Sequence, residues 1–285
     1  MRSHLPDYDL EIAADLPHAL KLLAARDGWR PIAGGTDLMV LLNAGRLPYA
    51  KLVSIAKLAE LTSITASPEV LTIGAAVTYS AIQRHPLLQA EFPLLCQAAS
   101  WTGGIANQNR GTLGGNIVNA SPAADTPPAL LVYDAELQLI SEHGQRRILY
   151  SQFHRGYKRM DLHEDELVAK IHLPRQGRQL AQYARKVGAR RAQAISKVCF
   201  NALAEVDSSG IKHIRIALGS VAPVPLRCQN LEAALTGQAV TPSLIAHARE
   251  LIAGEIQPID DIRSTARYRS LVAQNLLGEF LGRLL

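Results

Sequence analysis

The sequence predicts an α+β protein, and three patterns along its 285 residues support that fold class. Short apolar strand-like segments alternate with segments of helical spacing in residues 1–56. Alternating apolar residues predict two antiparallel strands around the turn at residues 207–210. Helical spacing then dominates the end of the chain. With 48% apolar and 19% charged residues, the composition is typical of a globular chain that buries a sizeable core.

The first unit covers about residues 1–56 and begins with a predicted helix after Asp15. Asp15 is a suitable N-cap, Pro17 suits the first helical turn, and Gly28 is expected to end the helix. A short strand, a glycine turn, a helix and a second strand at 51–56 are expected to follow. These elements predict a small unit in which β and α segments are interleaved.

The second unit covers about residues 57–176 and begins with two strands around a Ser-Pro turn in segment 64–75. Thr78 is expected to cap a helix that continues through Pro86, and a further helix follows it. Alternation over residues 129–148 then predicts a hairpin.

The character of the chain changes near residue 176, where the third unit begins. We therefore predict an N-terminal domain of residues 1–176, made of two subdomains, and a C-terminal domain of residues 177–285. After its strand pair the C-terminal domain is expected to contain helices at residues 226–235, 241–254 and 268–285.

Charge and targeting signals narrow the classes of function. The net charge of +5 and the pI of about 9.2 permit an anionic ligand without requiring nucleic acid. No apolar run approaches the roughly 18 residues of a membrane span. The first residues lack the basic and apolar pattern of a secretory signal. We expect a cytoplasmic protein with neither nucleic acid nor membrane as a partner.

The sequence offers no metal-ligand cluster. Its cysteines are far apart, form no metal-spaced pair, and are expected to be buried reduced thiols. Three histidines in the middle of the chain have a spacing that forms no metal site, and they are expected on the surface. The residues concerned are Cys96, Cys199 and Cys228, and His154, His163 and His172.

Two segments each contain a Gly-Gly pair followed by small polar residues: 32–39 (IAGGTDLM) and 112–125 (TLGGNIVNASPAAD). Glycine permits positive φ and lets a ligand approach the backbone closely. Consecutive N–H groups in such a turn form an anion site, especially before a helix. Two facing segments would therefore suit the linked phosphates of a dinucleotide. Neither segment matches a Rossmann turn or a P-loop, and ordinary tight turns are the alternative.

Both segments resemble the flavin loops of the FAD-binding medium subunit of the molybdenum hydroxylases, the family of xanthine dehydrogenase and carbon monoxide dehydrogenase. The blocks YDAELQLIS, FHRGYK, YARKVGARRAQAISKV and YRSLVAQNLL extend the resemblance over nearly the whole chain. The resemblance implies an FAD-binding fold of the vanillyl-alcohol-oxidase (PCMH) type. In that fold two α+β subdomains clasp FAD and a C-terminal α+β domain follows.

The resemblance also implies which residues hold FAD. The backbone of the first segment would hold the diphosphate, and the second segment would supply a second set of N–H donors. Asp125 matches an acidic residue near the polar middle of FAD, with a turn residue as the alternative. Thr102 stands where some relatives carry an aromatic residue, and Asn109 is kept in a run that otherwise departs from the family pattern. The implied contacts are Pro31, Ile32, Ala33, Gly34, Gly35, Thr36, Asp37, Leu38, Thr102, Asn109, Thr112, Leu113, Gly114, Gly115, Asn116, Asp125 and Lys197.

Lys197 has a particular implied role, because it matches a lysine near the flavin ring system. A reduced flavin carries negative charge, so a nearby ammonium would stabilise it and raise its potential. A solvated lysine on a strand edge is the alternative.

Electrons must reach such a flavin from a partner or directly from a substrate, because the sequence shows no metal-ligand cluster and no catalytic acid–base pair. The resemblance implies the first route. A large subunit with a molybdenum–pterin centre would hydroxylate the substrate, and a small subunit with [2Fe–2S] clusters would relay electrons to FAD. FAD would pass them to an acceptor such as NAD. The chain is thus expected to be an oxidoreductase subunit with no catalytic or metal-binding residues of its own.

Two other functions stay open at the level of the sequence. The chain could be a self-sufficient flavin oxidoreductase of the same fold that acts on its own small substrate. It could also bind nucleic acid through the basic run between Arg178 and Lys197, although only Tyr183 offers an aromatic ring there for stacking.

Overall fold

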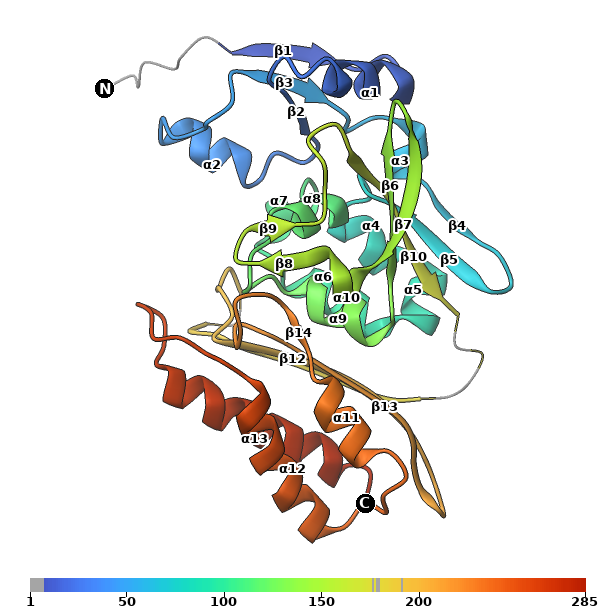
Figure 1. The fold of residues 1–285 in the computed structure, drawn as a ribbon, viewed down its shortest axis with the longest axis vertical. Helices are drawn as coiled ribbons and strands as arrows, with labels where there is room; N and C mark the ends of the chain where they lie inside the picture. The colour runs from blue at the N-terminus through green and yellow to red at the C-terminus, as the bar shows by residue number, and fades with distance from the viewer. Residues whose placement is uncertain (1–7, 176, 178–179, 191) are drawn as a thin grey trace.

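Three larger sheets lie one below another along the long axis of the computed structural model, with helices on and between them (Figure 1). The structure describes residues 8–175, 177, 180–190 and 192–285. The predicted α+β class is confirmed. The predicted boundary at residue 176 falls on a residue outside these ranges and stays a prediction.

The N-terminal sheet contains three parallel strands in the order β1–β3–β2. Asp15 caps helix α1 as predicted, because its side chain accepts a hydrogen bond from the N–H of His18. The helix ends at Ala24, and Arg26 takes a φ of 52°, so the chain turns before it reaches Gly28. The prediction that Gly28 ends this helix is wrong. The elements are β1 (Asp9–Ile12), α1 (Leu16–Ala24), β2 (Trp29–Ile32), α2 (Leu38–Asn43) and β3 (Lys51–Ser54).

The central sheet contains five antiparallel strands in the order β4–β5–β10–β6–β7. Its middle strand, β10, comes late in the chain and pairs with strands from both earlier hairpins. A separate two-stranded hairpin, β8–β9, stands beside the sheet (Figure 1). These strands are β4 (Ile64–Ala66), β5 (Val70–Gly74), β6 (Glu136–Ser141), β7 (Gly144–Leu149), β8 (His154–Gly156), β9 (Arg159–Met160) and β10 (Leu167–Pro174).

Proline determines where two helices of the central unit begin. The predicted helix through Pro86 is instead two helices, because proline has no N–H to donate and disfavours helical geometry at His85. Pro127 and Pro128 lie in the first turn of α9. This helix includes residues 129–132, which were expected in the first strand of a hairpin, so that part of the prediction is wrong. The helices are α3 (Ala59–Thr62), α4 (Tyr79–Arg84), α5 (Pro86–Glu91), α6 (Pro93–Trp101), α7 (Ile105–Gln108), α8 (Leu113–Val118), α9 (Thr126–Val132) and α10 (Tyr150–Phe153).

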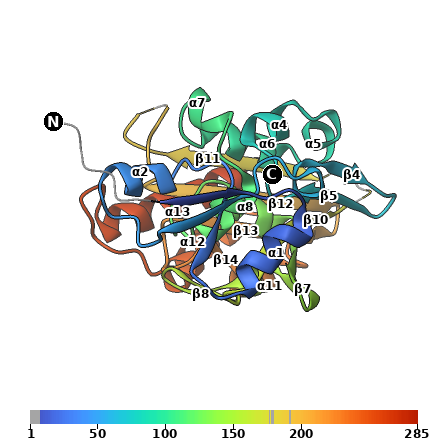
Figure 2. The same cartoon turned by 90° about the horizontal axis from the view of Figure 1, so that it is seen from above.

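The C-terminal unit is a four-stranded antiparallel sheet, β11–β12–β13–β14, with helices over one face. Figure 1 shows α12 and α13 on the side of this sheet that is away from the central unit, and both labels lie within the C-terminal unit in Figure 2 as well. The predicted strand pair and all three predicted helices are confirmed. The elements are β11 (Ala181–Val187), β12 (Val198–Asp207), β13 (Gly210–Gly219), β14 (Leu226–Arg227), α11 (Gln229–Leu235), α12 (Pro242–Glu255) and α13 (Ala266–Gly282).

Buried apolar side chains join the three units. Leu203 and Ala217 of the C-terminal sheet belong to the same core as helices α6 and α9 of the central unit. Ala19 of α1 shares a second core with Ile140 and Leu167 of the central sheet. Among the described residues, no helix combines the length and the apolar character that a bilayer span requires.

One histidine that the sequence predicts on the surface is buried, and its burial leads to a prediction of how the stability of the fold depends on pH. His172 lies within the central sheet, where its two ring nitrogens contact Thr72 Oγ1 (2.9 Å) and Gln138 Oε1 (3.1 Å). Burial, with Arg147 and Lys170 nearby, lowers its pKa to about 4. The expectation of an exposed His172 is wrong, because Thr72 of β5 and Gln138 of β6 contact this side chain on the face opposite Ile171 and Leu173.

The unfolded chain binds a proton at His172 near pH 6.5, whereas the folded chain does so only near pH 4. The free energy of unfolding is therefore expected to fall by about 3 kcal/mol as the pH drops through that interval. His172→Gln removes this term, whereas the exposed His163 serves as a control through His163→Gln. Urea unfolding at pH 7 and pH 4.5 measures the difference, and equal pH dependence of wild type and His172→Gln would contradict the assignment.

Candidate cofactor site

The two glycine segments touch each other at Gly34. A Cβ added to Gly34 would lie 2.0 Å from the carbonyl oxygen of Arg110 and 3.0 Å from the Cα of Gly111. The side chain of Arg110 also donates from Nε to the carbonyl oxygen of Gly34 (3.4 Å). Glycine at position 34 thus lets the first segment lie directly on the backbone that leads into the second.

The first segment has free backbone donors. Gly35 has a φ of 73°, which favours glycine, and helix α2 begins shortly after it at Leu38. Within the described part of the chain, no acceptor binds the N–H groups of Gly34, Gly35 or Thr36. Free N–H groups in a glycine turn suit an anionic ligand such as a phosphate.

The second segment differs from its prediction, because the N–H groups of residues 113–116 are already used inside the protein. Leu113 and Gly114 donate to Val77 O (3.0 Å) and Ala75 O (2.8 Å). Thr112 caps helix α8: its Oγ1 accepts from the N–H of Gly115 (3.1 Å), and its carbonyl oxygen accepts from Asn116. The expectation that these N–H groups form a second open cradle is wrong. Its Gly-Gly pair lies in the first turn of helix α8 rather than in a loop.

A cleft of about 1070 Å³ lies beside the contact between Gly34 and the backbone at Arg110 and is bordered by residues of all three units. Five of the predicted contacts line it: Thr36, Asp37, Thr102, Asn116 and Asp125. The other predicted contacts lie outside the lining. They are Pro31, Ile32, Ala33, Gly34, Gly35 and Leu38 around the first segment, Asn109, Thr112, Leu113, Gly114 and Gly115 around the second, and Lys197.

Asp125 forms a buried ion pair with Lys186 at the wall of the cleft. The Nζ of Lys186 lies 2.6 Å from Oδ2 of Asp125, and the two side chains are only 9% and 8% exposed. Ser196 donates to the other carboxylate oxygen (2.6 Å), and Lys186 donates also to Trp101 O (2.9 Å). Burial raises the pKa of Asp125, although Lys186 and Ser196 act in the opposite direction. The pair therefore ties the start of α9 to strand β11.

Lys197 lies elsewhere. Its ammonium is 5.2 Å from the centroid of the Tyr268 ring, a cation–π distance. Among the described residues it has no carboxylate within ion-pair distance, in contrast to Lys186. Asn109, another predicted contact, is exposed and accepts a hydrogen bond from Ser80 Oγ (2.6 Å).

Asp261 and Arg269 form an ion pair in the wall of the cleft that the C-terminal unit contributes. Arg269 donates to Asp261 Oδ1 (2.7 Å), to Lys197 O (2.9 Å) and to Ser220 O (3.1 Å). Burial alone would raise the pKa of Asp261, but the N–H groups of Arg263 and Ser264 and the guanidinium of Arg269 lower it to about 2. Asp261 thus stays ionised and fixes the loop before α13 as part of the wall.

The sequence did not single out several residues of this site. Lys186 and Arg269 were part of longer sequence blocks and were not predicted as site residues. Nothing in the neighbouring sequence indicates that distant segments of the chain bury them. A third Gly-Gly pair, Gly103 and Gly104, also lines the cleft, and Gly103 has a φ of 64°. The repeated Gly-Gly pattern was a signal that could have identified it.

The cleft fits a dinucleotide such as FAD. Its volume of about 1070 Å³ lies just above the range for small-molecule sites, roughly 300–1,000 Å³, as suits a large ligand. The free donors of the first segment suit a diphosphate, and hydroxyl, amide and charged side chains are among those that line the cleft. Among the described residues, no group of three or more His, Cys, Asp or Glu side chains could hold a metal. Cys199 and Cys228 are buried as predicted, whereas Cys96 is only half-buried.

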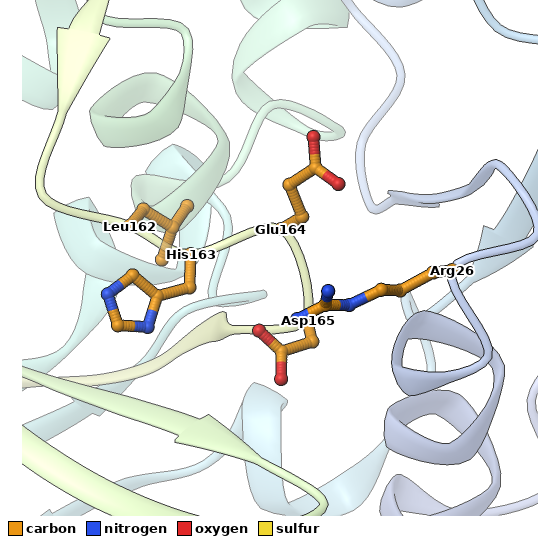
Figure 3. A pocket seen from close by; sticks show the side chains of 5 residues that line it. All are labelled: Arg26, Leu162, His163, Glu164 and Asp165. Carbon is orange, nitrogen blue, oxygen red and sulfur yellow. The ribbon is translucent and has the colours of Figure 1, made fainter.

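A second hollow of about 530 Å³ lies apart from the predicted contacts (Figure 3). Arg26 approaches it from the loop after α1, and Leu162, His163, Glu164 and Asp165 line it from the segment before β10. None of the residues predicted to hold a cofactor lines this hollow.

Two family profiles match the sequence and together cover most of it. Residues 6–176 match the FAD-binding domain in molybdopterin dehydrogenase. Residues 183–284 match the C-terminal domain of the carbon monoxide dehydrogenase flavoprotein.

Individual proteins match over nearly their whole length. The xanthine dehydrogenase FAD-binding subunit of Escherichia coli O157:H7 is 32% identical over 266 residues, which cover 93% of this chain and 91% of that protein. The glyceraldehyde dehydrogenase medium chain of Sulfolobus acidocaldarius is 30% identical, with 95% and 96% covered. Among solved structures, a carbon monoxide dehydrogenase from Hydrogenophaga pseudoflava that lacks the Mo-pyranopterin moiety superposes with a TM-score of 0.93 at 26% identity, covering 97% and 96% of the two chains.

Proposed function

This chain belongs to the family of FAD-binding medium subunits of molybdenum hydroxylases, and we propose that it is the flavin subunit through which a multi-subunit dehydrogenase passes its electrons. It carries an FAD-binding domain of the PCMH type and is an oxidoreductase flavoprotein. The observation that carries the proposal is the contact of two glycine segments beside a cleft bordered by all three units.

In the proposed site the N–H groups of Gly34, Gly35 and Thr36 hold the diphosphate of FAD by hydrogen bonds. Asn116 and Thr102 would add side-chain contacts, because both line the cleft. Bound FAD would supply the redox chemistry, and the protein would supply position and electrostatics. The remaining contacts implied by the resemblance stay predictions.

Two lysines are assigned different tasks in this proposal. Lys186 is neutralised by Asp125 and holds the wall of the cleft in place. Lys197 has no carboxylate partner among the described residues, so its positive charge is available to favour an anionic reduced flavin. Lys197 itself does not line the cleft, but its carbonyl oxygen accepts a hydrogen bond from Arg269, which does, and we keep Lys197 as the residue that tunes the flavin potential.

We propose that electrons reach FAD from the [2Fe–2S] clusters of a small subunit and leave to an acceptor such as NAD. A large subunit with a molybdenum–pterin centre would carry out the hydroxylation. In support, relatives of this chain are named as subunits or medium chains of dehydrogenases. Division into domains at residues 1–176 and 177–285, and a cytoplasmic location, belong to the same proposal.

The proposal predicts about one FAD per chain, bound without a covalent link. Acid precipitation of the purified chain, reconstituted with excess FAD and freed of unbound flavin, should release this flavin into the supernatant. Absorbance at 450 nm against protein concentration gives the ratio. A colourless supernatant from protein with an intact circular dichroism spectrum would contradict the proposal. Purification from the native source should also recover a molybdenum subunit and an iron–sulfur subunit, whereas full turnover by the chain alone would favour the self-sufficient flavin oxidoreductase.

A further inference from the structure

The hairpin β8–β9 has a two-residue tip, Tyr157 and Lys158, of which Tyr157 lines the cleft. The tip is firmly attached to the end of helix α8. His154 Nε2 donates to Ile117 O (3.0 Å), and Lys158 Nζ donates to the Asn119 carbonyl oxygen and to its Oδ1 (3.0 Å). Lys158 has a φ of 57°, an uncommon conformation for a residue other than glycine. The geometry of the tip is thus fixed by bonds to the same helix that begins at the second glycine segment.

Tyr157 is exposed although it is a large aromatic residue. Its exposure is 65%, and its side chain lines the cleft together with Thr36 and Asp37 of the first glycine segment. The other aromatic residue among the described residues lining the cleft is Tyr79, which is only 4% exposed and packs in the core. Tyr157 is therefore the aromatic ring that a ligand in the described part of the cleft could reach.

An aromatic ring on an anchored tip is well suited to contact a planar ligand. Tyrosine offers a large rigid surface at a low cost in conformational entropy. Planar nucleotide bases stack on such rings whatever their hydrogen-bonding pattern. A flavin dinucleotide contains two planar ring systems, adenine and isoalloxazine, on either side of its diphosphate.

We propose that Tyr157 packs against one of the planar rings of bound FAD, as a third point of attachment beyond the two glycine segments. The proposal rests on FAD binding in this cleft. Lys158 acts as a positioning residue, because its bonds to Asn119 hold the tip toward the cleft. Tyr157 shares the lining of the cleft with Asp37 of the first segment, and Lys158 is hydrogen-bonded to Asn119 of the second.

Titration of the flavin-free chain with FAD, followed by flavin fluorescence, tests the proposal. Tyr157→Ser is expected to raise the Kd for FAD roughly tenfold, whereas Tyr157→Phe should stay within about twofold of wild type. Ile105→Ser is the matched control, because Ile105 is 77% exposed near the cleft but does not line it. Thermal unfolding without FAD should be the same for all four proteins.

Competition against FAD identifies the ring. If Tyr157 contacts adenine, ADP should compete less well for Tyr157→Ser than for wild type. If Tyr157 contacts isoalloxazine, FMN should instead compete less well for Tyr157→Ser than for wild type. An unchanged Kd for FAD in Tyr157→Ser would overturn this proposal while leaving FAD binding itself intact. Failure of the wild-type chain to bind FAD would instead contradict the proposed function.

Discussion

Replacing Lys186 by methionine is expected to lower the free energy of unfolding by about 3–5 kcal/mol, because it leaves the buried carboxylate of Asp125 without its counter-ion. The carboxylate would keep one donor, Ser196, in a site that already raises its pKa. Methionine has a similar length, so the change removes charge rather than volume. Urea unfolding at pH 7, monitored by circular dichroism, measures the loss.

Two variants separate the effect of the ion pair from that of losing any lysine. Lys197→Met removes a cation that stacks on Tyr268, and we expect it to cost no more than about 1 kcal/mol. The double variant Lys186→Met with Asp125→Leu removes both charges, and it should recover a large part of the loss. A loss for Lys186→Met as small as that for Lys197→Met would show that Asp125 does not depend on its partner.

The two lysines also show what the sequence could predict and what it could not. Lys186 and Lys197 lie in the same basic run, and local pattern cannot distinguish them. Only the folded chain brings Asp125 to Lys186, across 61 positions of sequence, while Lys197 turns to Tyr268. Pairing of distant side chains depends on tertiary packing, which periodicity does not encode.

Elements with strong local signals were predicted well. Asp15 and Thr78 cap the helices that they were expected to cap, because side-chain capping is decided within a few residues. The turn at residues 207–210 likewise joins the expected strands. Local signals also produced errors: the chain turns at Arg26, so the helix expected to end at Gly28 ends at Ala24, and Pro86 begins a new helix because it has no N–H to donate.

The second glycine segment gives the most instructive difference. Its Gly-Gly pair suggested open backbone donors, yet Thr112 caps a helix and the N–H of Gly114 pairs with Ala75. Gly114 is needed for that close approach, since an added Cβ would lie 2.6 Å from the Cβ of Ala75. Gly34 and Gly114 therefore both permit close packing of backbone, and the first segment also keeps the free N–H groups that are proposed to hold the diphosphate. Sequence cannot tell close packing from ligand binding, because both favour the absence of a Cβ.

Gly34→Ala should separate the two segments and weaken FAD binding at least tenfold. The added methyl group would lie 2.0 Å from the carbonyl oxygen of Arg110, and backbone atoms on both sides limit how far either can move. We expect a loss of about 3 kcal/mol in the free energy of unfolding, at the upper end of the range for overpacking. Urea unfolding without FAD and fluorescence titration with FAD measure the two effects.

Gly254→Ala is the matched control, because it makes the same chemical change at a position where nothing lies within 4 Å of the added Cβ. Gly254 is in helix α12, where alanine is favoured over glycine, so this variant should gain roughly 0.5–1 kcal/mol. The two substitutions are thus expected to act with opposite sign on stability, and only Gly34→Ala should change the Kd for FAD. If Gly34→Ala binds FAD as tightly as wild type, the contact between the glycine segments is not what shapes the cofactor site, and the assignment of the diphosphate to the first segment fails with it.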